Sequence, residues 1–267
     1  MGESLAKLEP FARTTLESLL RIRRLDHTLT TALPPCDPCD DRATAPTGVV
    51  ALDARLGGGF PRGQISELVG RRSSGRTSLL LQIAAAATAR GELVAVVDAL
   101  DMLDVASAAA AGVVLERLLW IRGHVVVNPG LCRDMNQRAM EQALRALTLV
   151  LQAGNFGVVA FDIGDAPAEA VRRLPFTTWL RLQRMVEGSQ TVCVLLGGEP
   201  MARSSAGLTL RIGVRAEGGA LTGSAAAIRF TTRLFDGLDI EARIVRARAR
   251  PNEDARVSWT TRATSYA

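Results

Sequence analysis

The sequence has no long apolar run: no uninterrupted apolar stretch reaches 18 residues, so we predict no membrane span. The alanine-rich runs at 83–89 and 105–115 are shorter and are typical of buried or half-buried helices. The N-terminus also lacks a basic segment followed by a short apolar one, the pattern of a signal peptide. From these absences we expect a cytoplasmic protein without a membrane partner.

Lysine is almost missing, because Lys7 is the only lysine among 32 basic residues. A bias toward arginine along the whole chain indicates genome composition rather than function. The net charge is +5 and the isoelectric point is about 9.6. This charge is compatible with nucleic-acid binding but does not diagnose it.

Cysteine is also scarce. Cys36 and Cys39 have Cys-x-x-Cys spacing, but no second Cys or His pair follows at the spacing of a zinc site. They lie in a proline-rich stretch, so two exposed linker thiols are favoured over a redox or metal role. Cys193 lies in an apolar run and is predicted to be a core residue.

The chain divides into three predicted parts. Residues 1–29 show apolar positions at helical spacing with basic residues on the other face, which predicts an amphipathic helix. Residues 30–47 are rich in proline and predict a linker, and residues 48–267 form the core domain. The helix has nothing to pack on within its own segment, so we expect it to bind a partner, a second subunit or the core. Its candidate contact residues are Leu16, Leu19 and Leu20.

Within the core, short apolar runs alternate with helical patterns, which predicts an α/β fold with a mainly parallel sheet and helices on both faces. After residue 208 the pattern changes to alternation, which predicts antiparallel strands at the C-terminal end. The predicted strands are 65–69, 93–98, 118–121, 157–162, 191–196, 208–212, 226–230 and 240–248, and the predicted helices are 77–89, 106–111, 134–153 and 180–186.

Residues 70–77 follow the phosphate-binding loop pattern Gly-x-x-x-x-Gly-Lys-[Ser/Thr], except that Arg76 replaces the lysine. In such a loop, backbone N–H groups and a helix N-terminus surround a polyphosphate. A guanidinium is planar and bulkier than the ammonium for which the loop is shaped. Thr77 is the candidate direct ligand of Mg²⁺, and Asp162, at the end of an apolar strand, would hold its water shell. The candidate nucleotide-binding residues are Gly70, Ser73, Ser74, Gly75, Arg76, Thr77 and Ser78.

The residues around this loop resemble the start of the RecA recombinase core. The resemblance rests on Pro46-Thr47-Gly48, Leu52-Asp53, the run 56–63, Glu67 and the loop itself, and it extends over roughly residues 46–250. It implies a RecA-like P-loop core and a site for ATP and Mg²⁺.

Several working parts of the resembled family are altered. The catalytic glutamate falls on Leu100, which cannot orient or deprotonate water. The tyrosine that stacks on adenine falls on Ser107, and Asp104 matches the aspartate that contacts the base. Gly197-Gly198-Glu199 stands where the γ-phosphate-sensing glutamine is expected, and residues 200–205 are too few for the DNA-binding loop. We therefore expect weak or absent ATP binding and no ATP-driven strand exchange.

The chain is most similar to the ImuA branch of RecA-like proteins. This resemblance rests on the N-terminal helix, the altered core and Arg172-Arg173-Leu174 ahead of a strand. It implies an accessory role in DNA repair, in the damage-induced (SOS) response and in translesion synthesis. The implied partner is a Y-family polymerase-like protein.

Two other functions fit the sequence. One is an active DNA-dependent ATPase of the RecA/KaiC type, with Asp101 or Glu199 as base; the other is a regulator that binds RecA through the N-terminal helix. Arg246, Arg248 and Arg250 alternate with alanines, so on a strand they share a face at a spacing that suits DNA phosphates. A solvated strand edge that carries charge against aggregation explains the same row.

Overall fold

The computed structural model describes residues 43–125, 133–214, 237–248 and 255–262. Several predicted features lie outside the described residues. These are the N-terminal helix, residues 30–42 of the linker with Cys36 and Cys39, the strand 226–230, and Arg250.

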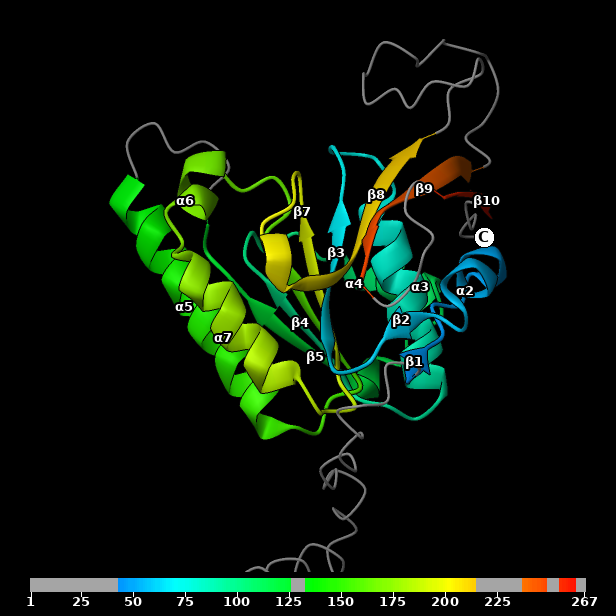
Figure 1. Cartoon of the computed structure of the whole chain (residues 1–267), viewed down its shortest axis with the longest axis horizontal. Helices are drawn as coiled ribbons and strands as arrows, with labels where there is room; N and C mark the ends of the chain where they lie inside the picture. The colour runs from blue at the N-terminus through cyan, green and yellow to red at the C-terminus, as the bar shows by residue number, and fades with distance from the viewer. Residues whose placement is uncertain (1–42, 126–132, 215–236, 249–254, 263–267) are drawn as a thin grey trace, which may run out of the picture. The chain divides into compact units, whose positions relative to one another are not determined.

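In the described residues, eight strands form one sheet in the order β10-β9-β8-β3-β7-β6-β4-β5 (Figure 1). The six strands from β3 to β8 are parallel, and β9 and β10 complete an antiparallel end. The mainly parallel α/β fold with C-terminal antiparallel strands is thus confirmed. The strands are β3 (Gln64–Val69), β4 (Val94–Asp98), β5 (Leu118–Arg122), β6 (Val158–Asp162), β7 (Val192–Gly197), β8 (Ala206–Val214), β9 (Gly237–Ala247) and β10 (Arg256–Arg262).

One strand corrects the expected topology in detail. The alternation at 208–212 placed this strand in the antiparallel end, but β8 runs parallel to β3 and antiparallel to β9. Strand direction therefore changes between β8 and β9. The pattern was misleading because Ala206 to Leu210 are all buried, and the partly exposed residues of β8, Arg211, Gly213 and Val214, lie only in its later part.

Helices cover both faces of the sheet, as the alternation of β4 shows. Val94 and Val96 belong to one apolar cluster, and Ala95 and Val97 belong to the other. In Figure 1, α5, α6 and α7 lie over one face and α3 over the opposite face. The helices are α3 (Arg76–Ala89), α4 (Val105–Ala110), α5 (Arg133–Ala153), α6 (Ala168–Arg172) and α7 (Phe176–Val186), with short 3-10 turns η2 (Leu115–Arg117) and η3 (Arg203–Ser205).

Three short elements precede the large sheet in the sequence: β1 (Thr44–Ala45), α2 (Val50–Leu56) and β2 (Phe60–Pro61). The strands β1 and β2 pair in antiparallel fashion. The Asp53 carboxylate accepts hydrogen bonds from the Thr47 amide at 2.8 Å and from the Thr47 hydroxyl at 2.7 Å. Gly59 has φ +126°, and a Cβ there would lie 2.0 Å from the Ala45 carbonyl oxygen. These residues of the RecA-like pattern therefore shape the backbone ahead of the sheet.

Among the described residues, no helix has the length and apolar character needed to cross a membrane.

Candidate nucleotide site

The phosphate-binding loop joins β3 to α3 and is held in shape by the sheet. The Gly70 amide donates to the Gly197 carbonyl at 3.1 Å, and Ser73 and Gly75 adopt φ values of 59° and 91°. A Cβ on Gly70 would lie 2.4 Å from the Ile212 carbonyl oxygen, and a Cβ on Gly75 would lie 2.5 Å from Cδ1 of Ile240. Close approach to the backbone of β8 therefore requires glycine at position 70, and the left-handed conformation favours glycine at position 75, where a methyl group would also displace the Ile240 side chain.

The loop presents unused hydrogen-bond donors. Gly75 precedes α3 in a left-handed conformation, and no described side chain caps the helix. The first N–H groups of a helix have no partner within it, so this end attracts anions. The buried Ser74 hydroxyl has no hydrogen-bond partner among the described residues. These donors fit a phosphate group.

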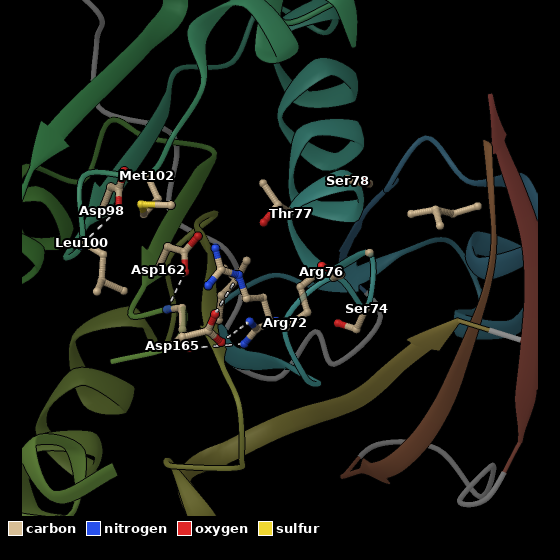
Figure 2. A pocket seen from close by; sticks show the side chains of 15 residues that line it. Arg72, Ser74, Arg76, Thr77, Ser78, Asp98, Leu100, Met102, Asp162 and Asp165 are labelled. Carbon is tan, nitrogen blue, oxygen red and sulfur yellow. Dashed lines mark hydrogen bonds and ion pairs between the residues drawn. The ribbon is translucent and has the colours of Figure 1, made fainter. Parts of the chain in front are cut away.

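A cavity of about 280 Å³ opens over the loop. Figure 2 shows its walls: the loop and the start of α3 on one side, and the ends of β4 and β6 on the other. It brings together six of the seven predicted nucleotide-binding residues, Ser73 to Ser78, and both predicted metal ligands, Thr77 and Asp162. The lining also includes Arg72, Asp98, Leu100, Met102, Gly164, Asp165, Leu196 and Leu238.

Arg76 is already paired inside this cavity. Its Nη2 lies 3.2 Å from Oδ1 of Asp165, and its Nη1 donates to the Gly164 carbonyl at 3.4 Å. The Arg76 side chain is only 9% exposed. Arg72 approaches the same carboxylate, with its Nε 3.9 Å from Oδ2 of Asp165 (Figure 2). The cation that replaces the usual lysine thus contacts a carboxylate of this chain.

Two further carboxylates end neighbouring strands. Asp98 on β4 and Asp162 on β6 are register partners. Burial raises the pKa of Asp162 to about 6. The negative charge of Asp98 raises this pKa further, whereas the hydrogen bond from the Gly164 amide and the charge of Arg76 lower it. Asp98 accepts hydrogen bonds from the Leu103 amide at 2.7 Å and the Trp120 indole at 3.3 Å.

The oxygen donors suit Mg²⁺ better than a soft metal, because they are a hydroxyl and carboxylates. No group of three or more His, Cys, Asp or Glu side chains in the described residues could hold a metal by itself. Thr77 and Asp162 could therefore hold Mg²⁺ only together with phosphate oxygens and water.

Neither substitute for a catalytic base lines the cavity. Asp101 has φ 59° and forms two hydrogen bonds with Arg122, at 2.6 and 2.7 Å. The hydrogen bond from Arg122 holds the pKa of Asp101 below its usual value, which makes it a poorer base. Glu199 lies 3.2 Å from Arg211 and is 78% exposed. Leu100 lines the cavity at the position expected for the base.

Asp104 and Ser107, the residues expected at the adenine, form the N-terminal cap of α4. Asp104 caps this helix by accepting from the Ser107 amide at 2.8 Å and the Ser107 hydroxyl at 2.5 Å. Met102, which sequence reasoning did not select, lines the cavity and is 66% exposed. Nothing in the sequence distinguishes Met102 from a methionine of the core, so its place in the cavity lining is evident only from the tertiary structure.

The residues after β7 are fixed to the core by Glu67. This carboxylate is 1% exposed and accepts from the amides of Met201 and Ala202, each at 2.7 Å, and from the Thr209 hydroxyl at 2.8 Å. Sequence reasoning quoted Glu67 only as part of the RecA-like pattern. Its role depends on partners more than 100 positions away, which local patterns do not show.

Two of the three arginines predicted to bind DNA have protein partners in the same region. Arg246 donates to the Arg203 carbonyl at 2.6 Å, and Arg248 donates to the Ser204 carbonyl. Both arginines therefore contact η3.

Comparison with known proteins agrees with this geometry. Residues 38–125 match the RecA N-terminal domain. The chain is 47% identical to RecA of Prochlorococcus marinus over 76 residues, which are 28% of this chain and 20% of that protein. Identity to RecA of Geobacter sulfurreducens is 39% over 123 residues (46% of this chain, 32% of that protein), and identity to RecA of Heliobacterium modesticaldum is 33% over 166 residues (57% and 44%).

These matches and the order of strands in the sheet support a RecA-like α/β core. The matches span between 20% and 44% of the lengths of these three relatives.

Proposed function

We propose that this protein is a degenerate RecA-like accessory factor in DNA repair and translesion mutagenesis, which acts through protein and DNA contacts with little or no ATP hydrolysis. The observation that carries the proposal is the residue at the position where the resemblance expects the catalytic glutamate, which is Leu100 in the lining of the cavity. Leucine has no group that accepts a proton, and the two suggested substitutes, Asp101 and Glu199, contact arginines and are not among the lining residues. These contacts disfavour the alternative of an active RecA/KaiC-type ATPase.

The nucleotide part of the proposal is a weakened site for ATP and Mg²⁺. Thr77 would contact Mg²⁺ directly and Asp162 its water shell, and Mg²⁺ would neutralise phosphate charge there. The buried Ser74 hydroxyl and the uncapped start of α3 would bind phosphate oxygens. The pairing of Arg76 with Asp165 supports weak binding, because this contact must be exchanged before phosphate meets the guanidinium.

The proposed partners are a Y-family polymerase-like protein and RecA, with residues 1–29 as the protein-binding segment. DNA is a further proposed partner. The Arg246–Arg250 row can bind backbone phosphate only with donors that do not already contact η3.

The test is ATP hydrolysis by the purified chain with and without single-stranded DNA, beside Asp162→Ala. Loss of a general base typically costs about 10²–10⁴ in rate, so we expect no turnover above background in either protein. A DNA-stimulated rate that disappears in Asp162→Ala would contradict the proposal.

A further inference from the structure

Among the described residues, Asp165 is the carboxylate that contacts both arginines lining the cavity, Arg72 and Arg76. It lies 3.2 Å from Arg76 and 3.9 Å from Arg72, and it remains 36% exposed at the mouth of the cavity. It follows β6 by three residues, on a turn whose Gly164 amide donates to Asp162 at 2.7 Å. The turn thus fixes Asp165 opposite the loop.

A carboxylate and a phosphate compete for the same donors. Both accept hydrogen bonds from a guanidinium, and both do so along its planar edge. Arg76 is nearly buried and directs both terminal nitrogens at this turn, Nη2 to Asp165 and Nη1 to the Gly164 carbonyl. While these contacts persist, the guanidinium of Arg76 is engaged by acceptors of this chain and not by a ligand.

The rest of the loop nonetheless retains features of an anion site. The partnerless Ser74 hydroxyl and the uncapped N-terminus of α3 line the same cavity. Neither feature is explained by packing within the described chain, because each leaves polar donors without partners.

We propose that Asp165 is an internal competitor for phosphate: it occupies Arg76 and Arg72 and thereby sets the affinity of the loop for polyphosphate groups. The inference rests on the proposed function only in treating the loop as a weakened phosphate site. The ligand class is a polyphosphate, either free or as part of a nucleoside triphosphate.

Local charge favours the same conclusion. Arg72 and Arg76 face Asp165, Asp98 and Asp162 across the cavity, so the carboxylates outnumber the arginines. Removing the charge of Asp165 releases both guanidinium groups and removes one repulsion of an incoming anion.

The test is calorimetric titration of the full chain with MgATP and, separately, with tripolyphosphate. Asp165→Asn is compared with the parent and with Asp101→Asn, which makes the same charge change beside Arg122 outside the cavity. We expect Asp165→Asn to bind both ligands about tenfold more tightly or better, and Asp101→Asn to bind like the parent. A gain for MgATP alone assigns the site to nucleotides, and a gain for both assigns it to the phosphates.

The double variant Asp165→Asn with Arg76→Ala should lose most of the gain, because Arg76 is the closer and more buried of the two arginines that Asp165 releases. Thermal melts verify folding, and Asp165→Ser replaces Asp165→Asn if the latter does not fold. Unchanged affinity of the folded Asp165 variants, or an equal gain in Asp101→Asn, overturns the inference. If Asp165→Asn instead gains binding and also hydrolyses ATP, the competitor role stands and the proposed lack of catalysis fails.

Discussion

Glu67→Gln should destabilise the core although the two side chains have nearly the same shape. The carboxylate is buried and accepts three hydrogen bonds, two of them from backbone amides. A hydrogen bond to a charged group contributes about 1.5–3 kcal/mol. Glutamine keeps an oxygen for the two amides, and Thr209 can turn to accept from its NH₂ group, so the loss is the charge-dependent part, about 2 kcal/mol.

The assay is thermal and urea unfolding of the parent and variants. For a domain of this size, about 2 kcal/mol corresponds to a fall in Tm of about 4–8 °C. Glu67→Ala should lose about 4–5 kcal/mol, because three buried donors lose their acceptor and a cavity remains. Glu199→Gln is the matched control: its carboxylate is 78% exposed with one ion pair, so it should change stability by no more than about 0.5 kcal/mol. If Glu67→Gln melts within about 1 °C of Glu199→Gln, the buried acceptor does not hold the loop.

Two further variants test the cavity and its loop. The pKa of Asp162 is raised from 3.8 to about 6, so its proton stabilises the folded state below pH 4, and this stabilisation is lost as pH rises through 6. Between pH 4 and pH 7 the free energy of unfolding of the parent should therefore fall by about 2–3 kcal/mol more than that of Asp162→Asn, as measured by urea unfolding. If the pH profiles of the two proteins are parallel, the pKa of Asp162 is not raised. Gly75→Ala should cost about 1–3 kcal/mol more than Gly91→Ala in the same assay, because both have positive φ but only the Gly75 methyl would meet Ile240. Equal losses would show that the loop relaxes away from β9.

The sequence predicted the buried strands and the loop well, because these depend on local patterns. The runs that became β4, β6 and β7 are apolar along their length, as strands covered on both faces must be. The sequence pattern assigned residues 180–186 to a helix, and α7 extends this segment back to Phe176, because its first turn is mostly polar or exposed and adds little to an apolar pattern. Pro175 in front of it was the signal that could have found this start.

The contacts that decide the chemistry were beyond sequence reasoning. Asp165 is one aspartate among several, and its approach to Arg76 depends on the path of the turn after β6. The pairing of Asp101 with Arg122 depends on a left-handed residue and on the neighbouring edge strand. Motifs identify the loop and the altered catalytic position, whereas the partners of each charge follow from the tertiary structure.

The central position of β3 has a consequence for how the chain is made. Its neighbours β7 and β8 begin roughly 120 and 140 residues after it ends, which the ribosome adds in about 6 to 28 s at 5–20 residues per second. During that interval an apolar strand has both hydrogen-bonding edges open, a state prone to aggregation. A nascent chain or truncated fragment that ends before Val192 carries the phosphate-binding loop on a strand with neither of its neighbours.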